Sequence, residues 1–331
     1  MAGFELSRRR LALMGGSLIG AGIAAPVLAA VPEAGPTTPP PAGGAAEAIA
    51  SQNDALDRLT VKVRVNGQGP FPFVVDTGAE RSTLALDLAA QLMLPMGSPI
   101  IVHGVAGAVT SPSALVGELA VGSRRLHDVE LPLLQRNDLG AAGVLGIDAL
   151  QGQRVELDFL HHEMRVQGTM RERPRGDEIV VTARGRFGQL VLVDAAFGHE
   201  PIMVVVDTGA QYSIGNPALK RMIHAESAQF AGSDSAQIFS VTGQTTTGQW
   251  ALISDVKIGG FGVNNLPVVF SDLHSFERWK LQSQPALLLG MDVLRQFERV
   301  DIDFARREVR FRGAGAWNDQ RYAGRAGALL G

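Results

Sequence analysis

The sequence predicts an all-β protein built from two similar lobes. The hexapeptide Val74–Ala79 recurs unchanged as Val205–Ala210. The segments around each copy are rich in Val, Ile, Leu and Phe, the residue types that strands favour. The chain has 331 residues, and single hydrophobic cores stop growing near ~250 residues. Length and repeat together indicate two related domains.

Composition excludes several classes of protein. With 46% apolar residues, the chain is too hydrophobic to be wholly disordered. A formal net charge of -3 offers no electrostatic basis for binding nucleic acid. Because there is no cysteine, disulfide scaffolds, thiolate zinc sites and cysteine nucleophiles are excluded.

Residues 1–30 are predicted to be an export signal. Ser7-Arg8-Arg9 precedes an uncharged apolar run that ends in small residues, and it resembles a twin-arginine signal. We expect cleavage after Ala29 and a periplasmic protein. An ordinary Sec signal, secretion, or retention as an inner-membrane anchor are the alternatives. Residues 31–57 are predicted to be a Pro/Ala-rich linker.

The internal repeat extends well beyond the hexapeptide. At the same offset of 131, Gly67 pairs with Gly198 and Ser82 with Ser213. Further along, the order is preserved while the offset drifts by small insertions, as the following pairs show: Val144–Leu150 with Leu288–Leu294, and Val155–Phe159 with Val300–Phe304. We therefore predict an N-terminal lobe at 58–170, a linker at 171–177, a C-terminal lobe at 178–312 and a flexible tail at 313–331.

Each element of the first lobe has a local signal. Alternating residues, an Asn-Gly turn and a buried run predict an opening hairpin. A short helix, a helical turn and a closing hairpin follow. In order, these elements are Thr60–Val65 with Phe71–Val75, Leu84–Leu92, a turn from Asp148, and Arg154–Phe159 with Met164–Gln167.

The second lobe repeats this plan. Asn216 is placed to cap a helix whose first residue is Pro217. The expected strands and turn are Gln189–Ala195, Ile202–Val206, a turn from Asp292, and Val300–Phe304 with Glu308–Phe311. The segment Asp272–Gln284 has no counterpart in the first lobe; it is either a specificity loop near the cleft or a surface insertion.

Asp76 and Asp207 are the candidate catalytic residues. A carboxylate at the end of a buried aliphatic strand is costly and needs a reason. If the two lobes pack face to face, both aspartates meet at the local two-fold axis. Two carboxyl groups so close share one proton, as the aspartic-protease dyad does. One can then take a proton from water while the other donates to a carbonyl.

The residues that follow each aspartate are predicted to support the loops. Gly78 and Gly209 let the backbones approach closely, and the hydroxyl groups of Thr77 and Thr208 can bond across the axis. Ala79 and Ala210 complete the two loops.

The paired Asp-Thr-Gly-Ala loops resemble those of the retropepsin-like bacterial aspartyl proteases. Each is followed by an aliphatic-aliphatic-Gly element, at Val144–Gly146 and Leu288–Gly290. The resemblance implies a bilobal pepsin/retropepsin-like acid protease fold with this element packed behind each loop. It also implies an aspartic endopeptidase that acts on extended polypeptide without metal or cofactor. Because both half-sites lie in one chain, a monomer suffices.

The resemblance further implies two flap hairpins, at His103–Ser111 and Phe239–Thr247. The first lacks a tyrosine. The residues expected to bind substrate from the flaps are His103, Gly104, Val105, Val241, Thr242 and Gly243.

Ala79 and Ala210 predict the working pH. Pepsin-like enzymes usually carry Ser or Thr there, and that hydroxyl group favours the ionised dyad. Its absence predicts activity in weakly acidic to near-neutral solution.

Several of these residues, and a few others, have alternative interpretations. The two aspartates could be ordinary turn formers. The alternative function is a catalytically silent module that retains the aspartic protease fold and only binds peptides or proteins. His161-His162-Glu163 is read as a solvated turn rather than a metal site. Ser82 and Ser213 are read as scaffold hydroxyl groups, and Asp148 and Asp292 as helix caps.

Overall fold

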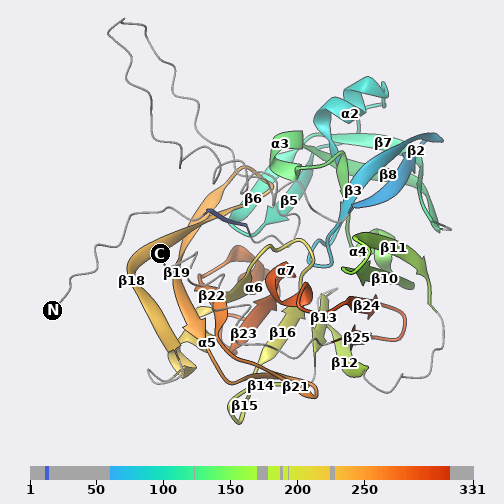
Figure 1. The fold of residues 1–331 in the computed structure, drawn as a ribbon. Coiled ribbons are helices and arrows are strands. Elements are labelled where there is room, and N and C mark those ends of the chain that lie inside the picture. The colour runs from blue at the N-terminus through green and yellow to red at the C-terminus, as the bar shows by residue number, and fades with distance from the viewer. Residues whose placement is uncertain are drawn as a thin grey trace, which may run out of the picture.

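The structure, a computed structural model, describes residues 12–14, 60–122, 124–169, 178–186, 189–192, 194–223 and 228–313 (Figure 1). The predicted linkers at 31–57 and 171–177 lie outside the described residues. So do the predicted tail beyond Gly313 and most of the predicted export signal. These assignments stay predictions.

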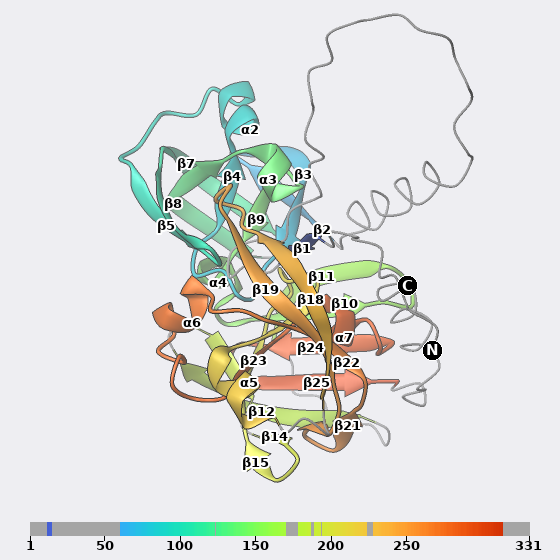
Figure 2. The same ribbon diagram turned by 90° about the vertical axis from the view of Figure 1, so that its left-hand side faces the viewer.

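The predicted fold class is confirmed: the protein is mostly β, with two lobes and short helices (Figures 1 and 2). In the first lobe, six strands close into a barrel in the order β2-β3-β9-β4-β8-β7. Their bounds are β2 Thr60–Val65, β3 Gln68–Val75, β9 Gly143–Leu145, β4 Thr83–Ala85, β8 Arg124–Leu134 and β7 Ser113–Val121.

The second lobe repeats this strand order as β13-β16-β23-β17-β22-β19. The directions also repeat, since β3 runs parallel to β9 as β16 does to β23. The repeat in the sequence is therefore a repeat in topology. The bounds are β13 Gln189–Leu192, β16 Met203–Val206, β23 Ala286–Leu289, β17 Ser213–Gly215, β22 Leu266–Phe270 and β19 Thr245–Ile253.

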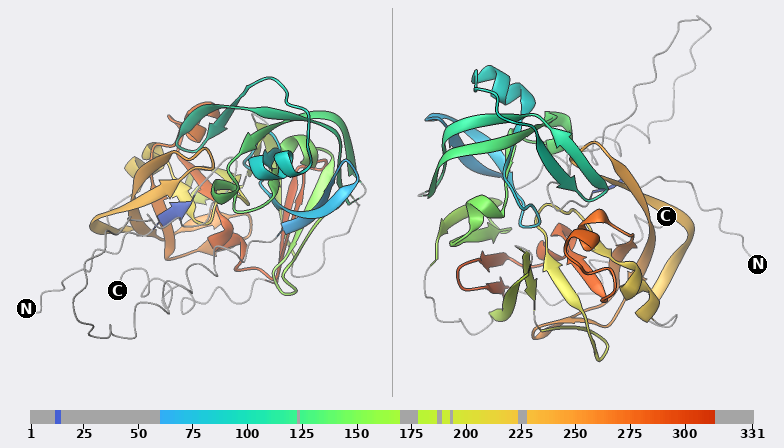
Figure 3. Two further views of the ribbon diagram at one scale, coloured as in Figure 1. Left: turned by 90° about the horizontal axis from the view of Figure 1, so that it is seen from above. Right: turned by 180° about the vertical axis from the view of Figure 1, so that it is seen from behind.

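A shared sheet joins the lobes. The closing hairpin of the first lobe pairs antiparallel with that of the second through β10 and β24. Both hairpins thus belong to one thirteen-stranded sheet that also holds the second lobe (Figure 3). The strands at this junction are β12 Ile179–Arg186, β25 Glu308–Arg312, β24 Arg299–Asp303, β10 Gln153–Asp158 and β11 Glu163–Gly168.

Local sequence explains the opening hairpin and the best-formed helix. Residues of β2 alternate exposed and buried, and Asn66 and Gly67 both adopt positive φ, as a tight hairpin turn requires. In the second lobe, Asn216 caps α5 (Pro217–Met222) by accepting from Leu219 N at 2.8 Å. Both features match the predictions.

The other helices are short. Helix α2 (Leu86–Gln91) begins later than predicted because Thr83–Ala85 pair as strand β4. The predicted turns are present as α4 (Ile147–Leu150) and α7 (Met291–Leu294). Two helices were not predicted, α3 (Arg136–Leu139) and α6 (His274–Arg278).

The expectation that Asp148 and Asp292 cap helices is wrong. The N-cap positions belong to Gly146 and Gly290, and neither helix has a side-chain cap bond. Both aspartates lie inside the first turn, and their carboxyl groups bind Ser82 and Ser213.

The remaining strands lie at the edges of this frame. The first flap is a separate hairpin of β5 (Ile100–Gly104) and β6 (Gly107–Ser111). The second flap is the turn between β18 (Ala228–Phe239) and β19, and β1 (Ala12–Met14) pairs in parallel with β18. A small sheet holds β14 Ala195–Phe197, β15 Glu200–Pro201, β20 Val256–Ile258 and β21 Phe261–Val263.

None of the helices in the described ranges is long and apolar enough to cross a membrane.

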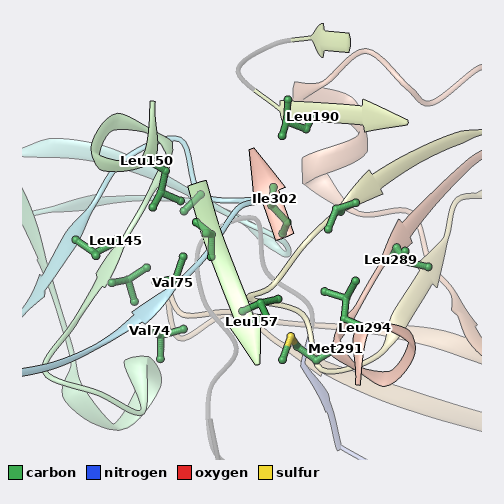
Figure 4. Close-up of a cluster of buried hydrophobic side chains, with 14 of the residues drawn as sticks. Val74, Val75, Leu145, Leu150, Leu157, Leu190, Leu289, Met291, Leu294 and Ile302 are labelled. Atoms are coloured by element: carbon green, nitrogen blue, oxygen red, sulfur yellow. The ribbon is translucent and has the colours of Figure 1, made fainter. Parts of the chain in front are cut away.

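One hydrophobic core runs through both lobes. Val75 and Leu145 from the first lobe and Leu289 from the second are all fully buried members of the same cluster. Figure 4 shows these side chains on either side of Leu157, which the shared sheet contributes. The core therefore holds the ends of β3 and β16 near one another.

Candidate functional site

Asp76 and Asp207 lie where the two lobes meet. Each follows the last residue of its strand, β3 or β16. The backbone N–H of Asp76 donates to Leu145 O, and that of Asp207 to Leu289 O, both at 3.0 Å. The predicted aliphatic-Gly elements thus lie directly beside the two Asp-Thr-Gly-Ala loops. Both aspartates are fully buried.

Each carboxyl group is held by its own loop. Asp76 Oδ1 accepts hydrogen bonds from the N–H groups of Gly78 at 2.7 Å and Ala79 at 3.0 Å. Asp207 Oδ1 accepts in the same way from Gly209 at 2.8 Å and Ala210 at 3.2 Å. The Oδ2 atoms of both residues are buried and have no hydrogen-bond partner in the described part of the chain.

The two loops pack against each other through their glycines. A Cβ atom at Gly78 would lie 2.7 Å from Asp207 Cγ, and one at Gly209 would lie 2.5 Å from Asp76 Cγ. Real Cβ atoms do not approach so closely. Each aspartate therefore rests on the glycine of the opposite lobe, and only glycine allows this approach.

Burial dominates the electrostatics of the pair. Burial, and after it the negative charge of Asp207, raises the pKa of Asp76 well above its usual range. Burial also raises the pKa of Asp207, to about 7. Backbone N–H groups that donate to each carboxylate oppose this rise but do not overcome it, whereas the interaction between the two carboxyl groups raises the pKa of Asp76 and lowers that of Asp207. At near-neutral pH the pair therefore holds a proton.

Thr77 and Thr208 lock the loops across the interface. Thr77 Oγ1 donates to Val206 O at 2.8 Å, and Thr208 Oγ1 donates to Val75 O at 2.7 Å. Each hydroxyl oxygen also accepts from the other threonine's backbone N–H at 3.1 Å. These four hydrogen bonds are buried and join one lobe to the other.

A serine and an aspartate brace each loop from behind. Ser82 Oγ donates to Asp148 Oδ1 at 2.7 Å and accepts from Gly146 N at 3.0 Å. In the second lobe, Ser213 Oγ donates to Asp292 Oδ1 at 2.9 Å and accepts from Gly290 N at 3.1 Å. The serines are scaffold hydroxyl groups, as predicted. In the sequence, only the internal repeat connects these serines with Asp148 and Asp292.

Gln189 was not predicted as a site residue. Its Nε2 donates to Gly78 O at 3.0 Å, so a strand of the second lobe holds the Asp-Thr-Gly-Ala loop of the first. The side chain is buried. The residue at the matching offset lies outside the described residues, so the repeat offers no signal for this contact.

Residues of the two predicted flaps contact one another. A Cβ atom at Gly104 would collide with Ser240 Oγ, and one at Gly107 would lie 2.8 Å from Gln244 Oε1. Thr242 joins this contact through a 2.7 Å bond to Ser240 Oγ. In Figure 2 the β18-β19 hairpin rises toward α3 of the first lobe, and a Cβ at Gly243 would be 3.5 Å from Asp138 Oδ2.

Two valines anchor the flaps in hydrophobic clusters. Val105, beyond β5, is fully buried among residues of the second lobe such as Phe276 and Trp279. Val241, in the second flap, is buried in the larger core. Apolar side chains therefore tie the first flap to the second lobe, and the second flap to the core that both lobes share.

His103 lies beside the tip of the β5-β6 hairpin, where it pairs with Ala108, and its ring contacts the inserted segment. Its ring stacks on His274 with centroids 5.3 Å apart, and Nδ1 of His103 lies 3.0 Å from Nε2 of His274. The backbone N–H of His274 also donates to Val105 O at 2.9 Å. The segment Asp272–Gln284, left open by the sequence, thus lies beside the first flap and lines a cavity with it.

His161-His162-Glu163 is an exposed turn at the shared sheet, as predicted. His161 Nδ1 lies 3.0 Å from Asp158 Oδ1. In the described ranges of the chain, no group of three or more His, Asp or Glu side chains is arranged to hold a metal ion.

A comparison with protein families agrees with this geometry. The family described as "Aspartyl protease" matches residues 61–149 and 193–293, which include both aspartates. Among solved structures, an aspartic proteinase from Irpex lacteus has a TM-score of 0.45 and 13% identity. That match covers 80% of this chain and 97% of the proteinase. No curated protein sequence matches significantly.

Proposed function

The chain belongs to the aspartyl protease family, and we propose that it is an aspartic endopeptidase whose catalytic pair is Asp76 and Asp207. The observation that carries the proposal is the pair itself. Two fully buried carboxyl groups, one from each lobe, each keep one oxygen without a partner among the described residues. Stability alone offers no reason to bury two such groups, since the burial is costly.

The raised pKa values suit the proposed chemistry. A pair that shares one proton has an acid and a base at once. The ionised carboxylate takes a proton from a water molecule as that water attacks the peptide carbonyl carbon. The protonated carboxyl donates its proton to the carbonyl oxygen. The tetrahedral intermediate then collapses, its C–N bond breaks, and a carboxyl group protonates the departing amine.

The hydrogen bonds around the pair keep it ready for this reaction. Backbone N–H groups hold each Oδ1 in place, which leaves each Oδ2 for the water and the substrate. Because the threonine bonds and Gln189 fix the two loops relative to each other, the carboxyl groups need not reorganise during the reaction.

We propose that the substrate is an extended polypeptide bound beneath the flaps, and that a monomer carries the whole site. Both half-sites come from one chain, which supports the latter. The Arg-rich start of the sequence supports export to the periplasm, with membrane attachment if the signal is retained. The small negative charge favours no nucleic-acid partner.

A digestion experiment tests the proposal. The mature protein is incubated with an unfolded protein between about pH 4 and pH 8, and products are mapped by mass spectrometry. We expect internal cuts, with the highest rate in weakly acidic to near-neutral solution. An activity maximum below about pH 3 would contradict the proposed role of Ala79 and Ala210.

The control is the doubly substituted protein, Asp76→Asn with Asp207→Asn. It should bind the same unfolded protein and cut nothing. If the wild type also cut nothing but bound peptides as the variant does, the protein would be a catalytically silent binding module.

A further inference from the structure

A cavity of about 280 Å³ lies beside the catalytic loop of the first lobe. Glu80 and Arg81, which directly follow the Asp-Thr-Gly-Ala loop, form one side of it. Strand β5 of the first flap forms another side. The inserted segment with α6 closes the far side, and Figure 2 shows α6 directly below β5. The cavity thus lies between the first flap and the residues that directly follow the Asp76 loop.

Most charges around the cavity are already paired. Arg278 from α6 donates to both oxygens of Glu80, at 3.1 Å and 3.0 Å, across the lobe interface. His274 Nδ1 lies 3.6 Å from Glu277. Burial, and after it the charge of Arg278, lowers the pKa of His103, so that ring is neutral at near-neutral pH. Glu80 therefore presents no uncompensated negative charge to a ligand.

Arg81 is the exception. Its side chain lines the cavity, is exposed, and makes no hydrogen bond or ion pair with any residue that the structure describes. The acidic group that senses its charge is Glu130, which is held elsewhere by Ser113 Oγ at 2.7 Å and Ser98 N at 2.6 Å. The wall of the cavity thus carries one cation available to a ligand.

A second polar group in the cavity has no partner. Thr83 lines it and is fully buried, and its Oγ1 forms no hydrogen bond within the described part of the chain. A buried hydroxyl group left unpaired is costly, so a ligand that accepts its hydrogen bond is favoured. Apolar side chains share the wall with these polar groups and suit methylene groups, among them Ile100, Val102, Pro132 and Trp279.

We propose that this cavity is a selectivity pocket for a glutamate side chain of the substrate, with Arg81 as its specificity-determining residue. The inference rests on the proposed peptidase function. The carboxylate of the substrate glutamate would pair with the Arg81 guanidinium and accept a hydrogen bond from the Thr83 hydroxyl group. The methylene groups of the glutamate would contact the apolar side chains of the wall. A lysine side chain would meet the unpaired cation and be rejected.

The test uses a peptide that the wild type cleaves, synthesised with Glu or Gln at each position flanking the cut. Glu and Gln have nearly the same shape, so their ratio isolates charge. We expect kcat/KM to favour Glu by about tenfold at one position, the value typical of one charge-assisted hydrogen bond. Arg81→Gln should bring the ratio to about one, and Arg81→Lys should retain part of it.

Arg125→Gln is the matched control, since Arg125 is exposed and lies near the other end of the strand that carries Pro132. It should keep both activity and the ratio. Equal cleavage of Glu and Gln peptides by the wild type would overturn the inference and leave the peptidase proposal standing. So would a Glu preference that survives Arg81→Gln.

A binding measurement separates the two proposals. The Asp76→Asn, Asp207→Asn protein is titrated against the same fluorescent Glu and Gln peptides, with and without Arg81→Gln. A wild type that cleaves nothing, beside a Glu preference in binding that needs Arg81, would defeat the peptidase proposal and keep the pocket. If the wild type cleaved nothing and no Glu preference in binding depended on Arg81, both the peptidase proposal and the selectivity pocket would be wrong.

Discussion

Asp207 makes the folded protein respond to pH in a predictable direction. Burial raises the pKa of this carboxyl from 3.8 to about 7 on folding. Between these two values the folded state binds more protons than the unfolded state, so stability falls as pH rises. The contribution of Asp207 to the free energy of unfolding is fully present below the pKa of the unfolded state. It is lost as pH rises through the pKa of the folded state.

Asp207→Asn should therefore stabilise the protein most at high pH. Asparagine keeps an oxygen for the N–H groups of Gly209 and Ala210 but never ionises. We expect its free energy of unfolding to exceed that of the wild type by a few kcal/mol near pH 8, and by less near pH 5. Urea denaturation at both pH values measures this. Asp272→Asn, at an exposed position, is the control; an equal gain at both pH values would contradict the account.

Gly78 should not tolerate even a methyl group. Because a Cβ there would overlap the carboxyl of Asp207, Gly78→Ala must push the pair apart. We expect kcat to fall by at least about 100-fold, since small displacements of catalytic groups cost that much. Gly262→Ala is the control, because nothing lies within 4 Å of its Cβ position. Full activity in Gly78→Ala would show that the loops are not packed as described.

At the scale of elements, the threonine bonds join two loops that lie 131 residues apart in a chain without cysteine. Thr208→Val removes the donor to Val75 O and the acceptor for Thr77 N, which leaves buried groups unpaired. The expected loss is about 1–3 kcal/mol for each unsatisfied group. Thr208→Ser keeps the hydroxyl group and should stay close to the wild type. Thermal unfolding and kcat are measured for both variants. If Thr208→Val and Thr208→Ser had the same stability and the same kcat, the role given to the hydroxyl group would be wrong.

Sequence alone predicts the hairpins, the capped helix α5 and the meeting of the two Asp-Thr-Gly-Ala loops, because each depends on local pattern or on the repeat. It does not predict α6, a helix of five residues without a side-chain cap. The stacking of His103 on His274 joins residues 171 positions apart. The register of β10 on β24 likewise joins distant strands. Such pairings depend on the packed lobes and leave no local signal.

Asp148 and Asp292 illustrate an ambiguity that sequence cannot resolve. Aspartate near a helix start usually caps it. Here a glycine holds the N-cap position, and the carboxyl turns to a serine of the catalytic loop instead. Only the repeat of a Ser-Asp pair in both lobes, at Ser82 with Asp148 and Ser213 with Asp292, connects these residues before the fold is known.

At the scale of the whole molecule, the two lobes should unfold together. They share a sheet, a hydrophobic core and the buried threonine bonds. Separating them would expose apolar surface and break strand pairing, so we expect one calorimetric transition whose measured enthalpy equals the van't Hoff enthalpy. Two resolved transitions, or an enthalpy ratio well above one, would show that the lobes are independent.

The central claim is that Asp76 and Asp207 act as one catalytic pair. The most direct test is kcat/KM for peptide cleavage by the wild type, Asp76→Asn, Asp207→Asn and the double variant. Residues that act as a unit lose their effect together, so each single variant should fall by at least about 1,000-fold and the double variant little further. A single variant that keeps activity within about tenfold of the wild type would contradict the claim.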